Sequence, residues 1–113
     1  MTNSPIDHAT FAELKETTGD EFASELVMTF LEEASHMIDE LKNAVASSDA
    51  ESYRRAAHSI KSNANTFGAT ALADLARKIE LGPCPEVGDL DDANALEVEF
   101  RRSADALRSL VHD

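Results

Sequence analysis

The chain of 113 residues has little of what interrupts helices or cross-links a small domain. It contains one cysteine, three prolines and four glycines, and no tryptophan. A single cysteine excludes an internal disulfide and favours a reducing compartment. The few prolines and glycines are clustered, so long stretches carry no helix breaker, and residues that favour strands are scarce beside alanine, leucine and glutamate. These absences predict an all-α protein.

Long apolar runs are also missing. No stretch approaches the roughly 18 apolar residues that span a bilayer. The first residues contain no basic segment followed by an apolar block, so they do not have the pattern of a secretory signal. We therefore expect a cytoplasmic protein that does not enter the membrane.

Positive charge is the third scarce feature. Ten lysines and arginines stand against 22 aspartates and glutamates, for a formal net charge of -12. Nucleic acid phosphates and anionic membranes repel such a chain, so neither is an expected partner. With 42% hydrophobic residues, the length suits one domain over residues 1–113 with a single core.

Apolar residues recur at intervals of three and four along most of the chain, which is the pattern of amphipathic helices. The pattern predicts helices over residues 6–17, 20–47, 49–67, 69–81 and about 90–111. Short loops make neighbouring helices antiparallel. We therefore expect an antiparallel up-down four-helix bundle with a short extra N-terminal helix.

Local signals mark the ends of the helix predicted over 49–67. Ser48 and Glu51 have the spacing of a capping box, in which the serine caps the helix and the glutamate reaches back. Gly68 follows at the position where many helices end in a left-handed backbone conformation.

The same helix is expected to present His58 away from its apolar side. At about 100° of rotation per residue, the apolar stripe and His58 fall on different sides of the helix. The helical neighbours of His58 are cationic or small and polar: Arg54, Lys61, Ser62 and Asn65. Arg55 adds a third positive charge nearby, and no carboxylate occurs between residues 53 and 72. The pattern predicts an accessible histidine on a basic face.

An accessible imidazole beside cations suits phosphoryl transfer. A neutral imidazole nitrogen can attack phosphorus, and nearby cations stabilise the charged oxygens of the transition state and product. A histidine on a helix surface is more often only solvated, and we interpret His8, His36 and His112 in this way. For His58 the basic setting favours a reactive residue, while helix geometry alone leaves both interpretations open.

The chain from His58 onward resembles the histidine-containing phosphotransfer (HPt) domain family. The motif is His58-Ser59-Ile60-Lys61-Ser62, then Phe67-Gly68-Ala69, with Leu72 and Ile79-Glu80 beyond. Upstream, Phe30-Leu31-Glu32-Glu33 in the long helix also fits. The resemblance covers essentially the whole chain, and it departs from the family at Ser62, where glycine is commoner.

The resemblance implies a monomeric bundle that accepts a phosphoryl group from the aspartyl phosphate of one receiver domain and passes it to the aspartate of another. It implies that His58 is phosphorylated and that Lys61 steadies the phosphoryl group. The partner-binding surface is expected to include Arg54, Arg55, Ser62, Asn65 and Gly68, with Ser62 keeping the surface small and Gly68 giving close packing after the helix.

By the same resemblance, the protein is a phosphocarrier without kinase activity of its own. It needs no cofactor, because the Mg²⁺ belongs to the partner receiver domain. The implied partners are response-regulator receiver domains and a hybrid sensor histidine kinase.

Three alternatives remain beside this interpretation. A histidine-kinase dimerisation domain would place an acidic residue after the histidine and usually a proline soon after, whereas Ser59 follows here and the next proline is Pro83. Glu33 and His36 have the Glu-x-x-His spacing of a di-metal bundle, but the second copy is missing, so we expect no metal site. A phosphate-independent helical adaptor, binding a receiver or kinase domain through the same face, stays open.

Overall fold

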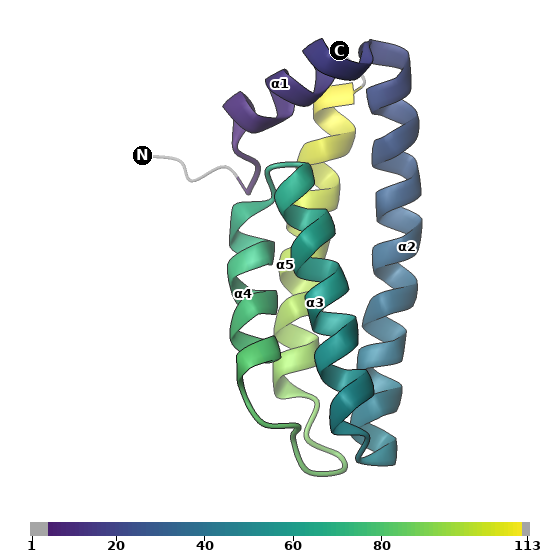
Figure 1. The fold of residues 1–113 in the computed structure, drawn as a ribbon, viewed down its shortest axis with the longest axis vertical. Helices are drawn as coiled ribbons and strands as arrows, with labels where there is room; N and C mark the ends of the chain where they lie inside the picture. The colour runs from purple at the N-terminus through teal and green to yellow at the C-terminus, as the bar shows by residue number, and fades with distance from the viewer. Residues whose placement is uncertain (1–4, 112–113) are drawn as a thin grey trace.

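The computed structural model describes residues 5–111. Within them the chain forms five helices and no strand: α1 (His8–Thr18), α2 (Asp20–Ser47), α3 (Ala50–Thr66), α4 (Thr70–Leu81) and α5 (Asp91–Val111). The helices α2, α3, α4 and α5 run side by side along the long axis, and α1 lies across one end (Figure 1). The predicted all-α, up-down four-helix bundle with an extra N-terminal helix is confirmed.

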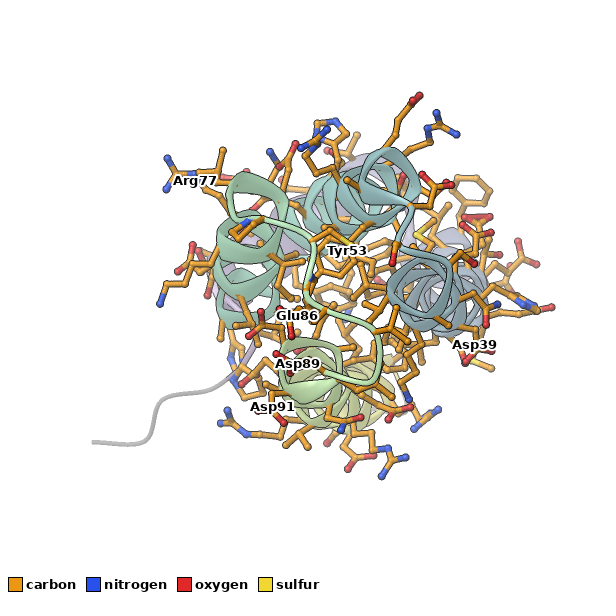
Figure 2. All side chains as sticks on the ribbon, turned by 90° about the horizontal axis from the view of Figure 1, so that it is seen from below. Asp39, Tyr53, Arg77, Glu86, Asp89 and Asp91 are labelled. Carbon is orange, nitrogen blue, oxygen red and sulfur yellow. The ribbon has the colours of Figure 1, made fainter. Side chains whose placement is uncertain are left out.

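The apolar stripes of the four long helices meet in one core. Fully buried aliphatic side chains come from all four: Val27, Ile38, Leu41, Ile60, Leu72, Leu96 and Leu107. Each such side chain stabilises the fold by about 1.5–3 kcal/mol relative to exposure. Figure 2 shows Tyr53 pointing into the centre of the bundle, consistent with its 1% exposure. The core therefore holds α3 by its apolar side and leaves the other side free.

An aromatic cluster joins three parts of the bundle at the end nearer α1. The ring of Phe30, on α2, stacks on Phe67 at the end of α3, with centroids 4.8 Å apart. The edge contact between Phe30 and Phe100 on α5 has a centroid distance of 6.5 Å. Such pairs contribute about 0.5–1.5 kcal/mol beyond their buried area. The stacking of Phe67 on Phe30 holds the end of α3 against α2.

None of the helices described within residues 5–111 is both long enough and apolar enough to cross a membrane.

The start of α3 differs from the predicted capping box. Asp49 caps the helix instead: its carboxylate accepts hydrogen bonds from the Ser52 backbone N–H at 3.1 Å and from the Ser52 hydroxyl at 2.7 Å. Ser48 ends α2 in the left-handed region, with φ of 53°, and Glu51 pairs with Arg55 at 2.7 Å. The prediction was wrong because the preceding helix uses Ser48 and the adjacent aspartate is an equally good cap.

The turn between α3 and α4 depends on Gly68. Its φ is +77°, as the predicted left-handed helix end requires. The start of α1 packs directly on this turn, where the Asp7 N–H donates to the Gly68 carbonyl at 2.6 Å. A Cβ at Gly68 would lie 2.8 Å from the Asp7 carbonyl oxygen and 3.1 Å from Cβ of Thr10. Gly68 therefore permits both the turn and the seating of α1.

We expect Gly68→Ala to lower the free energy of unfolding by about 2–4 kcal/mol, because a left-handed backbone cost and a steric clash act together. Gly88→Ala is the matched control, since Gly88 has φ of +92° but a Cβ added there would have no other atom within 4 Å. The control should lose only about 1–2 kcal/mol. Urea unfolding followed by circular dichroism measures both, and equal losses would contradict the close approach of α1.

Candidate functional site

His58 lies near the middle of α3, on the side that faces away from the core. Its side chain is 58% exposed, whereas its neighbours Ala57 and Ile60 are fully buried. The predicted exposure of His58 is confirmed. The imidazole is therefore open to a second protein.

Glu80 of α4 brings His58 and Lys61 together. One carboxylate oxygen, Oε2, lies 2.8 Å from Nδ1 of His58. The other, Oε1, accepts a hydrogen bond from Nζ of Lys61 at 2.7 Å. The turn at Gly68 makes α3 and α4 antiparallel neighbours, so residues 22 apart in sequence meet across the two helices. One carboxylate thus links the two residues that the sequence had placed on the exposed face.

This contact corrects the expected charge of the face. The sequence contains no aspartate or glutamate between residues 53 and 72, but Glu80 of the next helix contacts the same surface. The cationic charge of Lys61 is therefore balanced. In the sequence, Glu80 belongs only to the motif that resembles the family. Its position on the next helix means that α3 alone does not predict its contact with His58.

The same contacts lower the pKa of Glu80 and select one tautomer of a neutral His58. The hydrogen bond from Lys61 lowers the pKa of Glu80 below its ordinary value of 4.5; burial acts in the opposite direction, and the hydrogen bond from His58 adds to the lowering. An ionised carboxylate only accepts hydrogen bonds, so Nδ1 of a neutral His58 must carry the ring proton. Nε2 is then left with the lone pair, on the side of the ring away from Glu80.

The two arginines expected at the partner surface have different surroundings. Both are exposed and lie within one turn of His58. Arg55 pairs with Glu51 at 2.7 Å, so its charge is locally compensated. Within residues 5–111, Arg54 has no ion-pair or hydrogen-bond partner.

The small residues expected at that surface also separate into two groups. Ser62 and Asn65 are exposed on α3, one and two turns after His58. Gly68 is buried beneath the start of α1, where Asp7 and Thr10 cover it. Gly68 therefore gives close packing inside the protein, and its place in a partner-binding surface is limited to holding α3 in position.

No histidine, cysteine, aspartate or glutamate side chains within residues 5–111 gather in a set of three or more that could hold a metal ion. Glu33 and His36 are both exposed on α2. His8 is exposed at the start of α1, and His112 lies outside the described residues.

Comparisons with known proteins agree with this geometry. The family model described as "Hpt domain" matches residues 25–110. The chain is 29% identical over 107 residues to Sensor protein TorS of Escherichia coli (strain K12), an alignment that covers 95% of this chain and 11% of that protein. The chain thus spans about a tenth of the length of that relative.

A solved structure extends the similarity to three dimensions. The chain superposes on the crystal structure of histidine-containing phosphotransfer protein B (HptB) from Pseudomonas aeruginosa PAO1 with a TM-score of 0.75 and 27% identity. The match covers 98% of this chain and 94% of that one.

We expect Lys61→Met to raise the pKa of Glu80 toward 4.5, because the Lys61 hydrogen bond is the largest cause of its lowering. An NMR pH titration of the Glu80 carboxyl carbon measures this directly. Lys42→Met is the matched control: it breaks the 3.0 Å pair between Lys42 and Glu97 elsewhere on the bundle and should leave the Glu80 titration unchanged.

The direction of the shift also sets the pH dependence of stability. A carboxyl whose native pKa is lowered stabilises the fold fully above its unfolded pKa and loses that contribution as the pH falls through the native value. Wild-type protein should therefore lose more stability than Lys61→Met on acidification below about pH 4.5. Identical Glu80 titrations in the two proteins would contradict the assigned contact.

Proposed function

Because this chain belongs to the Hpt domain family, we propose that it accepts a phosphoryl group on His58 from the aspartyl phosphate of one receiver domain and passes it to the aspartate of another. Histidine phosphotransfer in two-component signalling is the function of that family, and the finer assignment rests on one observation. An exposed imidazole has its Nδ1 committed to Glu80, beside an ammonium group on the same helix.

The proposed step needs no proton to leave the ring. The lone pair on Nε2 forms the P–N bond while the P–O bond to the receiver aspartate breaks, and that aspartate leaves as a carboxylate. The phosphorylated ring then carries a positive charge, and its Nδ1–H continues to donate to Glu80. In the onward step the aspartate of a second receiver attacks phosphorus, and His58 leaves as the neutral imidazole from which it began.

In this proposal Glu80 is a positioning residue and Lys61 contacts the transferred group. Lys61 lies one helical turn after His58, and its ammonium group has three N–H donors. It can donate to a phosphoryl oxygen while Glu80 is still beside it. A cation at that position stabilises the negative charge on the phosphoryl oxygens during transfer.

The partners we propose are response-regulator receiver domains and a hybrid sensor histidine kinase. The similarity to a stretch of a sensor protein supports a sensor protein as one of them. The receiver supplies the Mg²⁺ and the aspartate, and this chain supplies the nucleophile. The protein then acts as a phosphocarrier and not as a kinase.

Labelling by phosphorylated receivers tests the assignment of His58. Wild-type protein should acquire an acid-labile, base-stable phosphoryl label from at least one receiver of its organism, and His58→Gln should acquire none. His36→Gln is the matched control, because His36 is an exposed histidine on another helix, and it should label like wild type. Binding of receivers without any labelling would favour the phosphate-independent adaptor instead.

Variants of the two supporting residues test their separate roles. We expect Lys61→Ala to slow transfer by about a hundredfold to a thousandfold, as the loss of one charge-stabilising donor does in other enzymes. Glu80→Gln keeps an acceptor for Nδ1–H, whereas Glu80→Ala removes it, so transfer should fall in the order wild type, Gln, Ala. NMR of the ring nitrogens should show the Nδ1–H tautomer declining in the same order. A tautomer ratio unchanged in Glu80→Ala would remove Glu80 from the mechanism.

A further inference from the structure

The ion pairs of α3 and α4 determine which cations near His58 keep an uncompensated charge. Lys61 is paired with Glu80 at 2.7 Å, and Arg55 with Glu51 at 2.7 Å. In the described part of the chain, two other arginines of these helices, Arg54 and Arg77, have no ion-pair or hydrogen-bond partner. They are the free positive charges of this side of the bundle.

Arg77 lies on α4, three residues before Glu80, and its side chain is exposed. Three residues correspond to about 300° of rotation, so Arg77 lies about 60° around α4 from the carboxylate that contacts His58. Figure 2 shows Arg77 pointing outward from α4, away from the core. Asp74, one turn before Arg77, is exposed as well but forms no ion pair with it in the described structure.

The antiparallel arrangement places the two arginines on opposite sides of the His58 site along the bundle axis. Arg54 precedes His58 by four residues on α3, a rise of about 6 Å. Arg77 precedes Glu80 by three residues on α4, a rise of about 4.5 Å in the opposite direction. One cation therefore lies toward each end of the bundle from the cluster of His58, Lys61 and Glu80.

Within residues 5–111, no other helix carries an arginine without an ion-pair partner. The net charge is -12, and the cations of α2 and α5 are paired with carboxylates, as in Lys42–Glu97, Arg101–Glu97, Arg102–Glu99 and Arg108–Asp105. An acidic surface is thus repelled by most of the protein. Free cations on two different helices favour one approach and one orientation, with the partner's acidic site over His58.

We propose that Arg77 and Arg54 form a two-point docking surface for the acidic face of a receiver domain, and that Arg77 helps to select among receivers. This inference rests on the proposed function and adds α4 to the docking surface. A receiver with a carboxylate opposite Arg77 is accepted, and one with a cation there is rejected by like-charge repulsion.

Charge reversal at Arg77 tests the inference, with the neighbouring Lys78 as the matched control. Lys78 is exposed and has no ion-pair partner within residues 5–111, but it lies about 160° around α4 from Glu80. Arg77→Glu and Lys78→Glu change the net charge equally. Single-turnover transfer is measured over a range of concentrations of the phosphorylated receiver that labels wild-type protein fastest, at low and high salt.

We expect Arg77→Glu to raise the half-saturating receiver concentration by about tenfold at low salt, because electrostatic attraction acts mainly on association. The rate at saturating receiver should change little, the difference should shrink at high salt, and Arg77→Lys should restore the wild-type value. Lys78→Glu should stay within about twofold of wild type.

Three results would overturn the inference: equal effects of Arg77→Glu and Lys78→Glu, an effect of Arg77→Glu that persists at high salt, or a fall in the saturated rate with unchanged half-saturation. Absence of wild-type transfer from every receiver is a different outcome. It would contradict the proposed function itself, and the docking surface with it.

Discussion

The carboxylate of Glu80 holds two side chains of the neighbouring helix at once, and the site depends on that contact. It requires α3 and α4 to be antiparallel and close. Gly68 makes the sharp turn between them, and buried alanines on both helices, Ala64, Ala73 and Ala76, let them approach. If α4 were displaced or rotated, Nδ1 of His58 would face water. The protein would then no longer favour one tautomer of the imidazole over the other.

The same contact determines what kind of surface the protein presents. Because Glu80 neutralises Lys61, the cluster around His58 carries little net charge while it is unphosphorylated. In the proposed transfer, the phosphoryl group adds negative charge at Nε2, and the ammonium group of Lys61, one helical turn after His58, stabilises it. The longer-range attraction then comes from the free arginines on α3 and α4, against an acidic body of net charge -12. In this proposal, phosphoryl transfer and docking depend on different residues of one face.

Local patterns in the sequence predicted the features that depend on a single helix, such as its bounds and its exposed side. The three-four periodicity predicted the ends of the helices to within a few residues. The helical projection of α3 correctly predicted that His58 is exposed. Contacts between helices could not be predicted in this way. Glu80 and Arg77 lie 22 and 19 positions after His58, and only the packing of α4 against α3 brings them close to it. The predicted capping of α3 by Ser48 was wrong because two neighbouring residues, Ser48 and Asp49, are both good caps. Ser48 ends α2, and Asp49 caps α3.

The most direct test of the account is to find which nitrogen carries the phosphoryl group. Protein labelled with ¹⁵N in its histidine rings is phosphorylated by a receiver, and the coupling between phosphorus and nitrogen is measured by NMR. We predict phosphorus on Nε2 of His58, with a proton retained on Nδ1 by the hydrogen bond to Glu80. Phosphorus on Nδ1 of His58, or on another residue, would contradict the central role of the Glu80 contact.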